Sequence, residues 1–115
     1  MTPIPNGSAT VILDVQASIE IPPRGILSRT IYEDDQIKVI LFGFDTGQAL
    51  SEHTAARPAI IHIIQGEAQV TLGTNSIAAR AGTWIHMPPH LPHSVQAKTP
   101  TTMQLVLLPQ LAESM

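Results

Sequence analysis

The stretch SEHTAARPAIIHIIQGE, Ser51 to Glu67, decides how this chain folds. Its second half, AIIHII, is apolar at every position but one, which is typical of a central strand covered on both faces. The stretch also holds two histidines nine residues apart, His53 and His62. Whether these imidazoles bind a metal, act as bases or only pack against their neighbours determines what the protein can do.

Short segments rich in β-branched residues recur along the whole chain. They are ATVILDV, GILSRTIY, QIKVILFGFD, AIIHIIQG, EAQVTLG, SIAARAG, TWIHMPP, HSVQA and TMQLVLL. The ten prolines and seven glycines lie mostly between them, where they end strands and form turns. In LGTN, Gly73 and Asn75 tolerate a positive φ, which suits a hairpin. The spacing predicts an all-β fold, an antiparallel sandwich or barrel of about six to eleven strands without a long helix.

Composition excludes several classes of function. The chain has 115 residues, enough for one domain, and no cysteine, so thiolate metal sites and cysteine nucleophiles are absent. A net charge of -3 with only six Lys and Arg residues offers no basic stripe for nucleic acid. No apolar run approaches the roughly 20 residues that cross a bilayer, and the first residues lack a basic leader. We therefore expect a soluble, cytoplasmic protein that binds neither nucleic acid nor membrane.

From Gly47 onward the chain resembles the cupin superfamily. That family has two motifs, G-x5-H-x-H-x3-E-x6-G and G-x5-P-x-G-x2-H-x3-N. The anchors that match are Gly47, His53 and Gly66 in the first motif, at about residues 47–66, and Gly82, Pro88 and His93 in the second, at about residues 82–97. The resemblance implies one cupin domain over residues 1–115, an antiparallel jelly-roll β-barrel whose inward residues hold a divalent metal.

The chain departs from this pattern at the metal-binding positions. Ala55 replaces the second histidine, Ala59 the glutamate and Ala97 the asparagine. The resemblance therefore leaves His53 and His93 as metal ligands, for a divalent transition metal such as Zn, Fe, Mn, Ni or Cu. Because transition-metal sites usually offer three or four protein ligands, this pair would hold the ion loosely, with non-protein atoms completing the shell. Alternatively, both histidines are neutral imidazoles hydrogen-bonded inside the pocket.

The alanines also predict the shape of the pocket. If Ala59 faces inward, the alternation of a strand turns Ile61 inward as well and His62 outward. We expect Ala55, Ala59, Ile61 and Ala97 to line a pocket that is wider and more apolar than a four-ligand metal site. Such a pocket, with two imidazoles at one end, suits a small and mostly apolar ligand with one polar head.

The other histidines have structural interpretations. In the cupin strand order, the segment of His62 lies beside that of His86, so the two could be neighbours on the outer face. His90 occupies the second glycine of the motif, and histidine is among the residues enriched at positive φ, so we expect it in a turn. Trp84 is expected to pack in the core or at an interface.

Three functions remain open on the sequence alone. The first is a small-molecule-binding cupin, with a weakly held divalent metal, that acts as a sensor or accessory protein. The second is an enzyme, a metal-dependent dioxygenase or an isomerase with His53 or His93 as general base. The third is a scaffolding barrel with a vestigial pocket. A strand apolar on both faces needs cover outside the barrel, so we also expect a homodimer, joined through ATVILDV or the face of His62 and His86.

Overall fold

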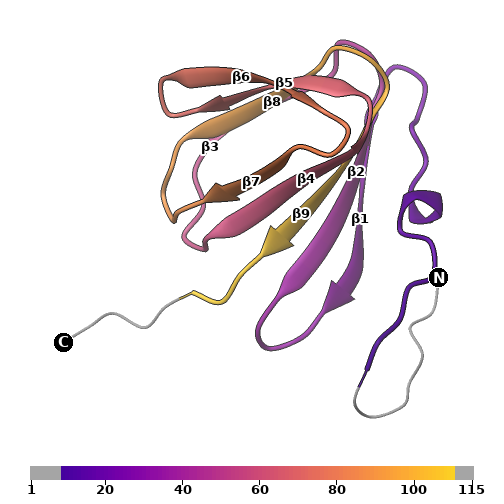
Figure 1. The fold of residues 1–115 in the computed structure, drawn as a ribbon, viewed down its shortest axis with the longest axis vertical. Coiled ribbons are helices and arrows are strands. Elements are labelled where there is room, and N and C mark those ends of the chain that lie inside the picture. Colours follow the sequence, from indigo (N-terminus) through magenta and orange to yellow (C-terminus); the bar gives the residue numbers. More distant parts are fainter. Residues whose placement is uncertain (1–8, 111–115) are drawn as a thin grey trace.

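The protein folds as two antiparallel sheets that face each other (Figure 1). The computed structural model describes residues 9–110. Its strands are β1 (Ile26–Glu33), β2 (Lys38–Phe44), β3 (Ala49–His53), β4 (Ala59–Gln65), β5 (Glu67–Leu72), β6 (Asn75–Arg80), β7 (Trp84–Met87), β8 (His93–Ala97) and β9 (Thr101–Leu107). The predicted all-β, antiparallel jelly-roll fold is confirmed, as is the strand count within the predicted range.

The order of strands in the sheets explains why β4 is so apolar. One sheet has the order β1-β2-β9-β4-β7 and the other β3-β8-β5-β6. As predicted, β4 is an interior strand, paired with β9 on one side and β7 on the other. Its burial alternates strictly from Ala59 to Ile63, and the side chains of Ala59, Ile61 and Ile63 are buried between the sheets. His62 faces the outside, which confirms the predicted phase of this strand.

The two sheets lie in close backbone contact at one end of the barrel, here called the clamped end, where two crossovers between the sheets meet. The first crossover is Gly66, between β4 and β5, and the second is the loop from Lys98 to Pro100. The carbonyl of Glu67 accepts hydrogen bonds from the N–H of Lys98 at 2.8 Å and from the hydroxyl of Thr101 at 3.1 Å. Gly66 has φ +89, and a Cβ there would lie 2.2 Å from the Pro100 carbonyl oxygen. Only glycine fits so close an approach.

The segment ATVILDV is not a strand, contrary to the prediction. Residues 9–15 run without regular structure into a 3-10 turn, Gln16–Ser18. This N-terminal segment packs on the outer face of β2: a Cβ on Gly43 would lie 2.2 Å from the Glu20 carbonyl oxygen, and Leu41 on the same face is 0% exposed. The N-terminal segment therefore lies over the outside of a sheet rather than extending one. Of its apolar residues, Ile12 and Val15 are half-buried, whereas Leu13 is 91% exposed. No helix within residues 9–110 is long and apolar enough to span a membrane.

A turn after β2 sets the position of β3, a strand that the sequence pattern did not reveal. The carboxylate of Asp45 accepts hydrogen bonds from the N–H of Arg24 at 2.6 Å and of Thr46 at 2.8 Å. These bonds hold the pKa of Asp45 below its ordinary value. The N–H of Gly47 then donates to the Ala97 carbonyl at 2.9 Å, so that β3 starts in register with the end of β8.

Two turns lie where the sequence predicted them. Gly73 and Thr74 join β5 to β6, and Gly73 has φ +62. Asn75 begins β6 and is not at positive φ. His90 has φ +67 in the loop before β8, which confirms its role in a turn. Its N–H donates to the Ala55 carbonyl at 2.7 Å, so this turn is tied to the loop after β3.

Candidate functional site

His53 and His93 meet because β3 pairs with β8. They are direct register partners, and their ring centroids lie 4.2 Å apart in an edge-on arrangement. On β8, His93 faces the barrel interior together with Val95. On β3, the register shifts between Leu50, the partner of Val95, and His53. The one extra residue of this bulge returns His53 to the face that Leu50 occupies, where simple alternation would have turned it away.

Each imidazole is fixed by a carbonyl of its own chain two residues earlier. The Nδ1 of His53 lies 2.9 Å from the Ser51 oxygen, and the Nδ1 of His93 lies 2.8 Å from the Leu91 oxygen. A carbonyl oxygen only accepts hydrogen bonds, so both Nδ1 atoms must carry the proton. In the neutral form of a ring held in this way, the lone pair is on Nε2. Two Nε2 atoms are left to accept a hydrogen bond from a ligand or to bind an ion.

The two histidines lie at the wall of a small apolar cavity between the sheets. Its volume is 190 Å³. Its lining comes from both sheets and from the loops beside them: His53, Ala55, Arg57, Ala59, Met87, Pro88, Leu91, His93, Leu105 and Leu107. His93 is only 8% exposed whereas His53 is exposed. The cavity is therefore lined by one buried imidazole and by one that is also accessible to solvent.

Four of the six predicted site residues come together here. His53, His93, Ala55 and Ala59 all line the cavity, whereas Ile61 and Ala97 do not. Ala97 is 0% exposed and pairs with Ala68 near the clamped end of the barrel. It lies four residues from His93 along β8, about 13 Å at the rise of a strand. Ile61 is 1% exposed and belongs to the packed core.

Sequence reasoning missed Arg57 and the apolar walls. Leu105 and Leu107 alternate along β9, and this period of two was the only signal that could have placed them on one face. Arg57 lies in the loop between β3 and β4, where no periodicity applies. Its Nε donates to the Leu108 carbonyl at 2.9 Å and its Nη2 to the Gln36 carbonyl at 2.9 Å.

The donor set does not match a transition metal held by protein alone. Among residues 9–110 no group of three or more His, Asp or Glu side chains converges. The two Nε2 atoms have the correct tautomer for coordination, but Ala55 and Ala59 present methyl groups in the same cavity. Structural and catalytic metal centres usually take three or four protein ligands. The arrangement is better matched to a ligand with an apolar body and a hydrogen-bond donor.

The remaining histidines lie outside this cavity. His62 is the register partner of Trp84 and His86 that of Ile60, so the two histidines are diagonal neighbours on the outer face. The predicted adjacency of their segments is confirmed. Trp84, 61% exposed, is on this outer face and not in the core.

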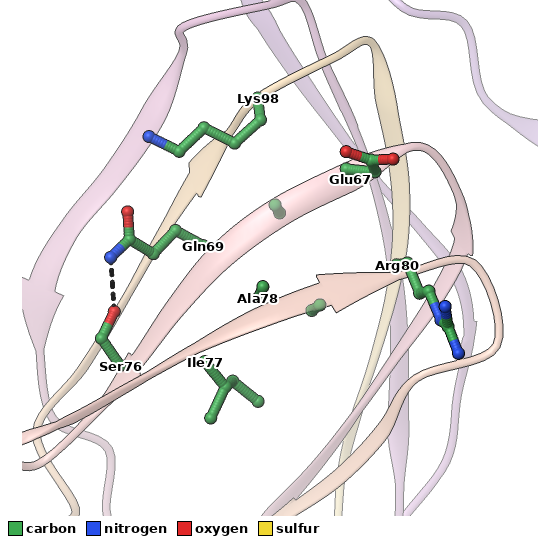
Figure 2. Close-up of a pocket in the computed structure, with 9 residues that line it drawn as sticks. Glu67, Gln69, Ser76, Ile77, Ala78, Arg80 and Lys98 are labelled. Carbon is green, nitrogen blue, oxygen red and sulfur yellow. Dashed lines mark hydrogen bonds between the residues drawn. The ribbon is translucent and has the colours of Figure 1, made fainter.

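A larger hollow of 700 Å³ lies over the outer face of β5 and β6 (Figure 2). Figure 2 shows Gln69 bonded to Ser76, while the charged ends of Glu67, Arg80 and Lys98 point in different directions. All five of these side chains are polar and exposed. Because its polar groups do not converge, this hollow lacks the features of a ligand site.

Comparison with known proteins shows which family and which solved structures this chain is similar to. The family model described as "Cupin domain" matches residues 40–109. A conserved protein of unknown function from Streptococcus pyogenes is 28% identical, with a TM-score of 0.81 over 97% of this chain and 98% of that chain. A cupin superfamily protein from Desulfitobacterium hafniense is 26% identical, with a TM-score of 0.78 over 82% of this chain and 86% of that one. A search of curated proteins returned no match.

Proposed function

Because the chain belongs to the cupin family, we propose that it binds a small, mostly apolar molecule in the cavity beside His53 and His93. The single observation that supports this most is the pair of Nε2 lone pairs set in an apolar wall. They would accept a hydrogen bond from a hydroxyl of the ligand. Typical ligand pockets measure about 300–1,000 Å³, so a cavity of 190 Å³ favours a ligand smaller than most cofactors.

In this proposal the protein is a cytoplasmic sensor or accessory protein formed of one domain. A cavity with oriented polar groups favours ligand binding over a purely scaffolding role. The second candidate is an enzyme, a metal-dependent dioxygenase or an isomerase acting on a small organic substrate. One observation favours an isomerase in particular: an Nε2 lone pair inside an apolar cavity is placed as a general base would be. Exchange of a ligand C–H proton with solvent would distinguish this enzyme from a binding protein.

Filling the cavity tests ligand binding. Cyclohexanol, used as a neutral probe, should shift the NMR signals of the methyl groups of Leu105 and Leu107 in the native protein. Ala59→Leu should abolish these shifts, because the added side chain occupies the space that the probe needs. Ala78→Leu, at an exposed position of β6, is the matched control and should leave them unchanged. Unaltered binding in Ala59→Leu would rule out this cavity, and Ala55→Leu repeats the test should the first variant not fold.

Restoring the missing donors tests the weakly held metal. Ala55→His combined with Ala59→Glu should tighten Zn²⁺ binding by about a hundred-fold, roughly 2.8 kcal/mol, because two metal-contacting groups are added. Without the two restored donors, the single substitution His93→Ala should remove the weak Zn²⁺ binding of the native protein, and His62→Ala should not. The measurement is isothermal titration after dialysis against a chelator. Unchanged affinity in the double variant would contradict the assignment of Ala55 and Ala59 to the metal-facing side.

We also propose a homodimer joined through the outer face of the five-stranded sheet. Trp84 is 61% exposed there, beside the half-buried Ile60 and its register partner Val106. A stable contact should bury on the order of 2,000 Å² in total. Sedimentation velocity at micromolar concentration should show a dimer that Trp84→Glu converts to a monomer, while Lys98→Glu does not. A monomeric native protein would contradict the proposal.

A further inference from the structure

Arg57 places a permanent positive charge in the wall of the cavity. It is the only Lys or Arg among the ten residues that line this space, and none of the ten is Asp or Glu. The other side chains of the lining are two imidazoles and apolar groups. An anion that enters this cavity therefore meets an attractive charge and no opposing carboxylate.

The guanidinium of Arg57 is held in one orientation by backbone carbonyls. Nε donates to the Leu108 oxygen at 2.9 Å, and Nη2 donates to the oxygens of Gln36 at 2.9 Å and Leu107 at 3.4 Å. These three bonds join the β3–β4 loop to the end of β9 and to the β1–β2 turn. They fix the plane of the guanidinium before a ligand arrives, which lowers the entropy lost on binding.

The charge of Arg57 is not neutralised within the described part of the chain. Its partners are neutral carbonyls, and no carboxylate of residues 9–110 forms an ion pair with it. Nη1 has no hydrogen-bond partner among the same residues. The two unused N–H groups of this half-buried guanidinium are both on Nη1, so they can donate to a carboxylate oxygen through that one atom rather than through a bidentate fork. Such charge-assisted bonds are stronger than neutral ones.

We infer that the ligand of this cavity is a small, apolar carboxylic acid in its ionised form, with its carboxylate at Arg57. The inference rests on the proposed ligand-binding function and adds the charge of the ligand to it. The two imidazoles do not compete for the carboxylate, because their Nε2 atoms are acceptors in the neutral ring. They are left for a hydroxyl of the same molecule, so the cavity distinguishes the two ends of its ligand.

The test compares two probes of equal shape that differ in charge, cyclohexanecarboxylate and cyclohexanecarboxamide. Binding is measured by titration at about pH 8, where imidazole is ordinarily neutral, so that only Arg57 favours the anion. The native protein should prefer the carboxylate by about ten-fold or more, as expected for a hydrogen bond to a charged group. Arg57→Gln should bring the ratio of the two affinities close to one, and Arg57→Lys should retain part of the preference for the carboxylate. Arg80→Gln, at an exposed position of β6, should leave the ratio unchanged.

The outcomes separate the charge of the ligand from the function itself. Equal binding of both probes by the native protein, or an undiminished preference in Arg57→Gln, overturns the role of Arg57 while leaving the cavity as a ligand site. Failure of both probes and of cyclohexanol to bind overturns this inference together with the proposed function. Should Arg57→Gln not fold, the salt dependence of binding to the native protein is measured instead. Added salt should weaken the binding of the carboxylate and leave that of the carboxamide unchanged. Equal effects of salt on the two probes would overturn the inference.

Discussion

The pairing of β3 with β8 is the constraint on which the candidate site depends. β3 has only five residues, most of them exposed, so its own burial does little to hold it in the sheet. Its position comes from the turn around Asp45, from the register with β8 and from the bulge before His53. Without the bulge, regular alternation from Leu50 would turn His53 to the opposite face of the sheet, and His93 would be the only imidazole that lines the cavity.

The two ends of the barrel differ in how closely the backbones of the two sheets approach each other. At the clamped end, Gly66 and Glu67 bring backbone from both sheets into contact that leaves no room even for a methyl group. At the other end, Ala55 and Ala59 leave space where larger side chains would fill it. The rigid end holds the strands in register, and the open end can therefore contain a cavity without loss of the fold. This division explains why Ala97, at the clamped end of β8, does not line the cavity.

Most of the fold could be predicted because short segments rich in β-branched residues alternate with glycine and proline turns along the chain. β4 was predicted from its apolar run and its phase from the motif position of Ala59, from which the outward position of His62 followed. ATVILDV was misassigned because apolar residues that cover the outside of a sheet have the same composition as a strand. β3 was absent from the segments identified by composition because tertiary pairing, rather than its own hydrophobicity, makes it a strand. Arg57 could not be assigned from the sequence, because loop geometry and distant carbonyls bring it to the cavity.

The central claim is that His53 and His93 present unprotonated, uncoordinated Nε2 atoms to the cavity. It is tested most directly by ¹⁵N NMR of the histidine side chains in protein purified without added metal, at about pH 8 where neutral imidazole predominates. The account predicts that both rings carry their proton on Nδ1, with Nε2 shifts typical of a free lone pair, and that His93→Ala removes one of these signals. A proton on Nε2 of either ring, or Nε2 shifts typical of a bound metal that persist after treatment with a chelator, would contradict it.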